Sequence, residues 1–233
     1  MSGIAGLAAG YGIPLPDEAA GKFAVYQELL LDWNSRMNLT AITDPDEIVV
    51  KHFLDSLLLL NAVNLPSGAA IIDVGAGAGF PGVPLKLARS DLKLTLLDSL
   101  RKRTLFLEEL SHQLGQSNEI IHARAEQLAR DSAYREAFDV ATARAVAGLP
   151  ALCEYCLPFV KPGGVFAAMK GPDCSAETAQ SANAIRELGG ELVGIKSFSL
   201  PNDHHRAVVL IKKISQTPPK YPRTGVKIAK TPL

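Results

Sequence analysis

The chain has 233 residues, of which 47% are hydrophobic and 21% are charged. This size and composition favour a globular protein with one large domain, or with one domain and an appendage. Its longest apolar run, around Leu57–Leu60, is far too short to span a bilayer, and the first 16 residues lack the basic start of a secretion signal. The chain has three cysteines, an odd number that makes a disulfide framework unlikely. The short apolar runs and the missing secretion signal lead us to expect a cytoplasmic protein without a membrane partner. Basic and acidic residues balance at 24 each, so the net charge is zero.

The first part of the chain predicts two helices. Residues 1–16 are rich in glycine and alanine and predict a loose or short-helical lead-in. Over residues 17–34 the apolar side chains recur at helical spacing. They are Phe23, Tyr26, Leu29, Leu30 and Trp33. A second helix is expected from Asp44 to about Val63, because Asp44 is a good capping residue and Pro45 suits the first helical turn.

The second helix carries a histidine and an acid on one face. His52 and Asp55 are three residues apart, and Ser56 lies one turn after His52. One interpretation is a catalytic dyad. The other is a histidine fixed by a neighbouring acid where this helix docks on the main domain, and we favour this docking role.

The stretch AAIIDVGAGAGFPG combines a buried strand with a glycine loop. Its first half, Ala69–Val74, is apolar with two adjacent β-branched isoleucines, which is typical of a strand covered on both faces of a parallel sheet. Gly75, Gly77 and Gly79 then allow positive φ and let a ligand approach the main chain. Pro81 suits the first turn of a following helix. This order predicts a nucleotide cradle at the carboxyl end of a sheet strand.

After the loop, strands and helices alternate. Further strands are expected at Leu92–Asp98, Asn118–His122, Phe138–Ala145, Val165–Lys170, Glu191–Phe198 and His205–Lys212. Helices are expected at Arg101–Leu114, from Ala125 to Arg130, at Leu149–Val160 and at Ser175–Leu188, with a turn over Lys161–Gly164. The last two strands are joined by a short polar link and predict an antiparallel pair. The pattern favours a doubly wound α/β fold with one reversed strand.

Two classes of adenosine cofactor compete for the glycine loop. Asp98 closes the second strand 19 residues after Gly79, where an acid accepts hydrogen bonds from ribose hydroxyls. Gly77, Gly79 and Gly82 satisfy the spacing of dinucleotide-binding loops, which is a weak motif by itself. Asp73, before the first glycine, would repel a pyrophosphate but could orient the loop or, through water, meet the ammonium of an amino-acid tail. S-adenosylmethionine has both that tail and an adenosine, and the terminal strand pair matches a seven-stranded methyltransferase sheet, so it is the expected cofactor.

Several motifs in order along the chain give a closer match. They are NLTAI (38–42), the set His52, Asp55 and Ser56, DVGAGAGFPGVPL (73–85), LLDSLRKRTLFL (96–107), HARAE (122–126), ARA (143–145), MKG (169–171) and the terminal YPRTGVKIAKTPL. Together they resemble the bacterial RsmG family, also called glucose-inhibited division protein B. The resemblance implies a seven-stranded, Rossmann-like class I methyltransferase that methylates N7 of a guanine in 16S ribosomal RNA, either free or within a partly assembled small subunit. We expect a helical cap (1–66), a methyltransferase domain (67–213) and a basic tail (214–233).

The resemblance also implies cofactor contacts. Gly75 and Phe80 would line the cofactor, and Ala125 and Glu126 would bracket the adenine. Arg144 falls where the family places an arginine facing the cofactor and the reaction site. With the loop residues, the expected cofactor-binding set is Asp73, Gly75, Gly77, Gly79, Phe80, Asp98, Ala125, Glu126 and Arg144.

The expected chemistry needs positioning rather than a base. Guanine N7 has a lone pair and no proton, so its methylation requires no general base. Arg144 and Lys170 are the expected positioning residues, and Arg144 suits a phosphate or guanine O6. The carboxyl edge of the sheet, where RNA would lie, also carries Lys102 and Arg103. The expected RNA-contacting set is Lys102, Arg103, Lys170, His205 and Arg206.

The C-terminal tail is strongly basic. From Lys212 onward the chain has six lysines and arginines and no acid, so this part carries +6 and the remainder −6. Such a tail fits a polyanion partner, to which it would add affinity without reading sequence. It equally fits a solvated, disordered terminus.

No metal is expected. Cys153 and Cys156 form C-x-x-C, but no second ligand pair stands at a suitable spacing, so core packing is favoured. His204 and His205 lack a third ligand. Three other functions stay open: a methyltransferase acting on another RNA site or on a small molecule, an RNA-binding protein that keeps the cradle without turnover, and a dehydrogenase.

Overall fold

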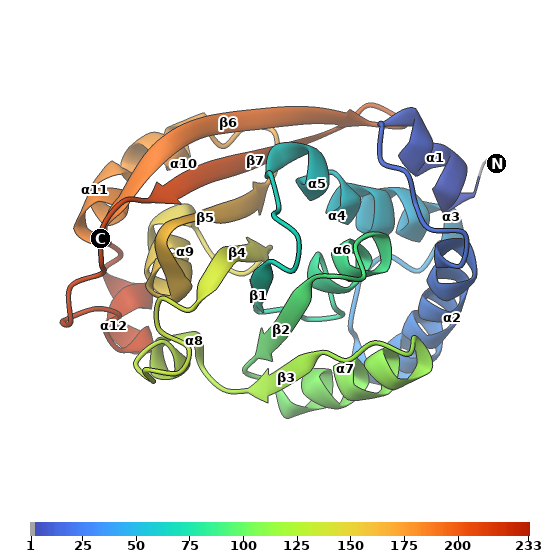
Figure 1. The fold of residues 1–233 in the computed structure, drawn as a ribbon, viewed down its shortest axis with the longest axis horizontal. Coiled ribbons are helices and arrows are strands. Elements are labelled where there is room, and N and C mark those ends of the chain that lie inside the picture. The colour runs from blue at the N-terminus through green and yellow to red at the C-terminus, as the bar shows by residue number, and fades with distance from the viewer. Residues whose placement is uncertain (1–2) are drawn as a thin grey trace.

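A computed structural model describes residues 3–233, and its centre is a single seven-stranded sheet (Figure 1). The strands are β1 (Ala70–Val74), β2 (Lys93–Asp98), β3 (Glu119–His122), β4 (Phe138–Arg144), β5 (Val160–Lys170), β6 (Gly190–Leu200) and β7 (His204–Lys213). Their order across the sheet is β3-β2-β1-β4-β5-β7-β6. All neighbours are parallel except that β7 runs antiparallel to both β5 and β6. The predicted α/β class with a reversed last strand is confirmed.

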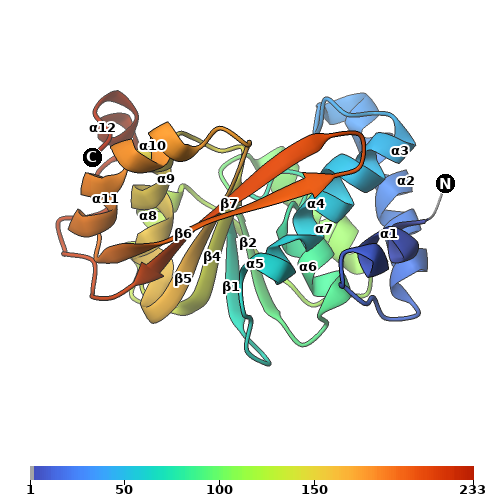
Figure 2. The ribbon, with the colours of Figure 1, turned by 90° about the horizontal axis from the view of Figure 1, so that it is seen from above.

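Helices cover both faces of this sheet (Figure 2). One face carries α1 (Ile4–Gly10), α2 (Ala19–Met37), α3 (Pro45–Ile48), α4 (Asp55–Leu57), α5 (Leu59–Ala62), α6 (Gly82–Ala88) and α7 (Arg101–Gln113). The other carries α8 (Ala125–Leu128), α9 (Leu149–Cys156), α10 (Ser175–Gln180), α11 (Ala182–Glu187) and α12 (Gly225–Lys230). Successive residues of a strand point to opposite faces, so Ile71 of β1 joins the first core and Ile72 joins the second. This double coverage explains why β1 is apolar without alternation.

The second predicted helix is confirmed at its start but not in its continuity. Asp44 caps it, since its Oδ1 accepts a hydrogen bond from the backbone N–H of Glu47 at 2.9 Å. After α3 the chain forms a π-helical segment, η1 (Val49–Leu54), before it returns to α-helix at Asp55. The wider π turn shifts the directions of side chains relative to an unbroken α-helix. His52 lies within this segment.

The turn predicted over Lys161–Gly164 does not separate a helix from a strand. Strand β5 already begins at Val160, which pairs with Phe138 of β4. The next pair joins Val165 to Val140, so five steps along β5 face two steps along β4. The intervening residues therefore bulge out of the sheet ladder, and the glycines and proline mark this bulge.

Three other helix predictions differ in detail. Pro81 is the residue that precedes α6 and does not lie in its first turn. The helix predicted over Ser175–Leu188 is divided at Ser181 into α10 and α11. Leu149–Val160 likewise changes at Leu157 to a short 3₁₀ segment, η2 (Leu157–Phe159). Differences of this size at helix ends are common, because local hydrogen bonds there compete with the helix.

The basic tail is folded against the body of the protein. Tyr221 and Ile228 are buried, and α12 packs on α9. Of the six cations from Lys212 onward, three form ion pairs with acids elsewhere in the chain. These pairs are Lys213 with Glu136, Lys220 with Glu187 and Arg223 with Glu154. The tail is thus ordered, and acids of the same chain compensate half of its positive charge. Its charge is therefore weaker evidence for a polyanion partner than the sequence indicates. The division of the chain into three parts stays a prediction.

Within residues 3–233, no helix is long and apolar enough to cross a membrane. The same residues hold no group of three side chains that could ligate a metal. Cys153 and Cys156 are buried in the second core, and burial raises the pKa of the Cys153 thiol to about 12. These cysteines therefore pack as small apolar side chains.

Candidate active site

A cavity of about 470 Å³ lies between the N-terminal helices and the carboxyl edge of the sheet. The sheet side is formed by the glycine loop after β1 and by residues at the carboxyl ends of β4 and β5. Because β7 is reversed, its first residues reach the same edge and contribute Arg206. The helical side contributes Leu39, Thr40, Ile42, Lys51, His52 and Asp55.

The glycine loop is held from both sides. On the sheet side, Asp98 Oδ2 accepts a hydrogen bond from the backbone N–H of Gly77 at 2.9 Å. On the helical side, the Tyr26 hydroxyl of α2 donates to the Ala78 carbonyl at 2.5 Å. Both partners are buried, so the loop has a fixed shape before any ligand binds.

The loop leaves its main chain open at one point. A side-chain carbon at Gly77 would meet only the Gly75 carbonyl oxygen, at 3.8 Å, so this position faces free space. At Gly75 it would come 2.7 Å from Cγ2 of Val146, whose side chain is partly exposed. At Gly79 it would come 2.7 Å from the Tyr26 hydroxyl. The open space at Gly77 therefore fits a ligand against the main chain, as S-adenosylmethionine requires, whereas Gly75 and Gly79 are closely packed against Val146 and Tyr26.

Asp73 lies beneath the loop and does not line the cavity. It is fully buried, and its Oδ2 accepts a hydrogen bond from the Gly82 N–H at 2.8 Å, at the start of α6. Its Oδ1 has no hydrogen-bond partner among residues 3–233. Burial raises the pKa of Asp73 from 3.8 to about 7, against the opposing effects of the Gly82 hydrogen bond and the charge of Arg144. These contacts orient the loop; a water-mediated contact with the cofactor stays a prediction.

The predicted adenosine end of the site lies outside this cavity. Besides its bond to the glycine loop, Asp98 accepts a hydrogen bond on Oδ1 from the Leu100 N–H at 2.8 Å. Ala125 and Glu126 begin α8, which follows β3 at the same edge of the sheet. The Glu126 carboxylate contacts Gly225 at the start of α12. The tail thus approaches the place predicted for the adenine.

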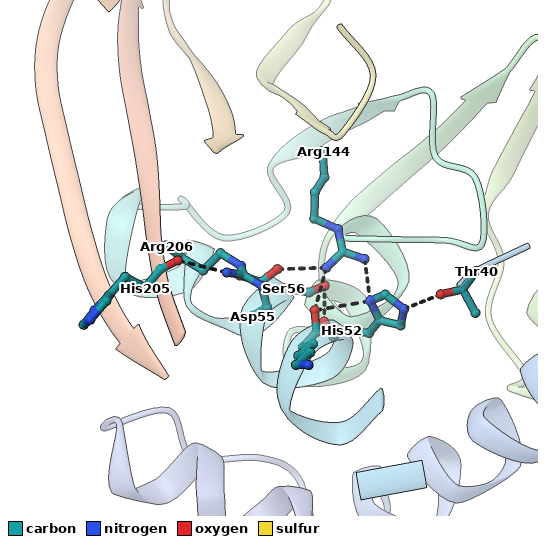
Figure 3. A network of polar contacts seen from close by, with 8 residues as sticks. Thr40, His52, Asp55, Ser56, Arg144, His205 and Arg206 are labelled. Atoms are coloured by element: carbon teal, nitrogen blue, oxygen red, sulfur yellow. Dashed lines mark hydrogen bonds and ion pairs between the residues drawn. The ribbon is translucent and has the colours of Figure 1, made fainter. Parts of the chain in front are cut away.

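Arg144, the last residue of β4, is fixed by three acceptors from the helical side (Figure 3). Its Nη1 donates to Asp55 Oδ2 at 2.9 Å and to the Lys51 carbonyl at 3.2 Å. Its Nη2 lies 3.2 Å from His52 Nδ1. The guanidinium carbon is 4.7 Å from the centre of the Phe80 ring, within the range of a cation–π contact. The cation is therefore held in one position inside the cavity.

His52 is neutral near pH 7. Burial, and secondly the positive charge of Arg144, lower the pKa of His52 from 6.5 to about 4. Because a guanidinium can only donate, His52 Nδ1 accepts from Arg144, and Nε2 donates to Thr40 Oγ1 at 2.7 Å. The ring also stacks on Phe80 with centroids 4.6 Å apart. Both ring nitrogens are thus engaged, and His52 connects the helical side to the sheet, in line with the docking role.

The predicted RNA-contacting cations divide into two groups. Arg103, Lys170 and Arg206 line the cavity. Lys170 is paired there with Glu177 at 3.0 Å and also donates to the Ala147 carbonyl. Lys102 and His205 lie on the exposed surface outside the cavity. The structure thus brings together only part of the expected set, and the RNA contacts stay predictions.

Most residues on the helical side of the cavity are not predicted from the sequence. Leu39, Thr40 and Ile42 received no role, although they belong to the motif NLTAI. Asp55 was assigned to docking, yet it lines the cavity and pairs with Arg144. One signal could have indicated them. The motif NLTAI and the pair His52 and Asp55 are part of the family resemblance, yet no chemical role explains their presence there.

The strand order, the reversed β7 and the glycine loop after β1 define the Rossmann-like fold of class I methyltransferases. Solved structures share this fold. The branched-chain polyamine synthase from Thermus thermophilus, in complex with N4-aminopropylspermidine and 5'-methylthioadenosine, has a TM-score of 0.62 at 16% identity, covering 89% of this chain and 67% of that one. TYW2 from M. jannaschii, in complex with AdoMet, has a TM-score of 0.52 at 16% identity, covering 64% of this chain and 71% of that one.

Sequence comparison identifies the family within this class. The family model described as rRNA small subunit methyltransferase G matches residues 19–207. A "Ribosomal RNA small subunit methyltransferase G" from Acetivibrio thermocellus is 50% identical over 228 residues, which cover 97% of this chain and 93% of that protein. One from Alkaliphilus metalliredigens is 48% identical over 224 residues, covering 95% and 94%. The chain belongs to the rRNA small subunit methyltransferase G family, as the sequence motifs predict.

Proposed function

We propose that this protein transfers a methyl group from S-adenosylmethionine to N7 of a guanine in 16S ribosomal RNA. The observation that carries the proposal is a single cavity that joins the open glycine loop to a fixed arginine and further cations at the sheet edge. Membership of the family supports the same activity. The proposed partner is 16S RNA, free or in a partly assembled small subunit, which makes the cytoplasm the proposed location.

The residues assigned to the cofactor form three sets. Gly75, Gly77 and Phe80 would hold its reactive end, since all three line the cavity. Asp98 would accept the ribose hydroxyls, with Ala125 and Glu126 beside the adenine. Asp73 and Gly79 would act indirectly, by fixing the loop. When bound, S-adenosylmethionine supplies a methyl group on a positively charged sulfur.

The titratable groups at the centre of the cavity support transfer without a general base. Guanine N7 has no proton to lose, so none is required. His52 is neutral with both ring nitrogens engaged, and Asp55 is paired with Arg144. The chain supplies orientation and exclusion of water. The stacked rings of Phe80 and His52 line the cavity, and Tyr26 stacks on Phe80 behind them.

The cations around the cavity are assigned to the RNA. Arg144 would donate to guanine O6 or to a phosphate, from a position that three acceptors hold fixed. Lys170, Arg103 and Arg206 would contact the RNA backbone, with Lys102 and His205 at the outer surface. Lys170 is a weaker candidate for an RNA contact than its place in the sequence indicates, because the Glu177 carboxylate already compensates its charge.

The decisive test replaces the target guanosine by 7-deazaguanosine in 16S RNA made by ligation, and uses labelled S-adenosylmethionine. We expect transfer to the guanosine RNA, mapped to N7, and none to the 7-deaza RNA, whose ring has C–H in place of the N7 lone pair. Equal transfer to both RNAs, or a label on a carbon or exocyclic amine, would refute the proposal. Calorimetry with S-adenosylmethionine and NAD tests the cofactor separately, since tight binding of NAD alone contradicts the assignment.

A further inference from the structure

One oxygen of Asp55 has no hydrogen-bond donor. The side chain is 4% exposed, and its Oδ2 accepts from Arg144 at 2.9 Å. Oδ1 has no hydrogen-bond partner among residues 3–233, and its only charged neighbour there is Arg206 Nε, at an ion-pair distance of 3.4 Å. Buried carboxylate oxygens in proteins are nearly always hydrogen-bonded, so this one requires an explanation.

The position of Asp55 indicates a ligand as that explanation. Asp55 lines the same cavity as the glycine loop and Phe80. The neighbouring Ser56 hydroxyl donates to the His52 carbonyl and so is not available to Oδ1. Oδ1 has almost no exposed surface while Arg206 lies beside it. The Arg206 side chain is 29% exposed, so a group with N–H donors that enters the cavity and displaces Arg206 would satisfy this oxygen.

We propose that the Asp55 carboxylate binds the N1–H and the exocyclic N2 amine of the target guanine and thereby selects guanine over other bases. This inference rests on the proposed function. Each carboxylate oxygen has two lone pairs, so Oδ1 can take the amine while Oδ2 accepts N1–H beside its bond from Arg144. Enzymes that act on a base outside the helix generally read this edge of the base.

The chemistry of the reaction favours a carboxylate at this place. Adenine presents a lone pair at N1, which a carboxylate repels, whereas guanine presents a hydrogen. When N7 takes up a methyl group, the purine ring becomes positively charged and its N–H groups become stronger donors. An acceptor with negative charge at the opposite edge then stabilises the transition state more than the free base. Asp55 also offsets the charge of Arg144 and Arg206, which would otherwise oppose that cation.

The test compares guanosine with inosine at the target position, because inosine keeps N7, O6 and N1–H but lacks the N2 amine. We expect the wild-type protein to methylate inosine RNA about 10- to 100-fold less efficiently in kcat/KM, the range for losing one good base contact. In Asp55→Asn we expect the amide oxygen to take the place of Oδ2, because the hydrogen bond from Arg144 at 2.9 Å is shorter than the contact with Arg206 at 3.4 Å. The NH₂ group then faces the guanine amine. The variant should therefore lose the preference for guanosine, with a ratio near or below one.

The matched control is Asp46→Asn, an acid on the exposed surface of α3, which should keep the wild-type ratio. Equal efficiency of the wild type on both RNAs refutes the inference, and this result does not depend on the folding of any variant. A lower rate of Asp55→Asn with an unchanged ratio also refutes it, because Asp55 then only positions Arg144. Absence of wild-type transfer to N7 of guanosine would instead be a failure of the proposed function.

Discussion

Replacing Asp73 by asparagine should stabilise the protein at neutral and alkaline pH. The carboxyl group is fully buried, with one hydrogen bond from Gly82 and one oxygen without a partner. Asparagine keeps an acceptor for the Gly82 N–H and has nearly the same volume. The substitution therefore removes a charge without opening a cavity.

The size of the effect follows from the pKa of Asp73, which burial raises from 3.8 to about 7. Between these two pH values the folded state holds a proton that the unfolded state has lost. Stability due to this group is therefore full at low pH and falls as the pH rises toward 7. Each pKa unit corresponds to about 1.4 kcal/mol, so the total loss is roughly 4 kcal/mol at most.

Urea unfolding of both proteins at about pH 4 and about pH 8 measures this effect. All other titrating groups are shared, so the difference in unfolding free energy between Asp73→Asn and wild type isolates Asp73. We expect that difference to grow by a few kcal/mol in favour of the variant on going to the higher pH. A difference that does not change with pH would refute the assignment of a raised pKa to this buried acid.

Two further substitutions test packing around the site. Gly79→Ala places a methyl group 2.7 Å from the buried Tyr26 hydroxyl at φ +93°, so it should lower the free energy of unfolding, measured by thermal unfolding, by about 3 kcal/mol. Gly68→Ala, where φ is positive but the space is open, should lower it by about 1 kcal/mol. Equal losses in the two variants would contradict the role of close packing at Gly79. Arg223→Ala leaves the fully buried Glu154 without its ion pair, so it should lower the free energy of unfolding in urea by about 3–5 kcal/mol. Lys220→Ala removes an exposed ion pair and should lower it by less than about 1 kcal/mol. A small loss in both variants would mean that the pair of Arg223 and Glu154 does not anchor the tail.

The sheet could be predicted because its signals are local. Strands β1 and β2 are short, largely apolar runs bounded by turn residues, and the glycine loop marks the carboxyl end of β1. The prediction was wrong where strand and turn signals overlap. Lys161–Gly164 contains a proline and two glycines, yet it forms a bulge within β5, and residues before and after it pair with β4. A bulge and a turn have the same composition, and only the partner strand distinguishes them.

Charge was the least predictable property, because it depends on partners far away in sequence. The tail counts as +6, but Glu136, Glu154 and Glu187 compensate half of it across the fold. Lys170 is likewise placed at the expected edge and then paired with Glu177. The residues could be located from the sequence, while the charge available to a ligand could not.

The N-terminal helices also position a charged group of the site. All three acceptors that hold the Arg144 guanidinium, namely the Lys51 carbonyl, His52 Nδ1 and Asp55, come from one helical segment, and the π-helical turn is part of that segment. The sheet positions the backbone of Arg144 and the glycine loop, but contacts from the helical segment fix the position of the guanidinium. A reaction that depends on orientation therefore requires both parts, and the helical segment is a component of the site rather than a cover over it.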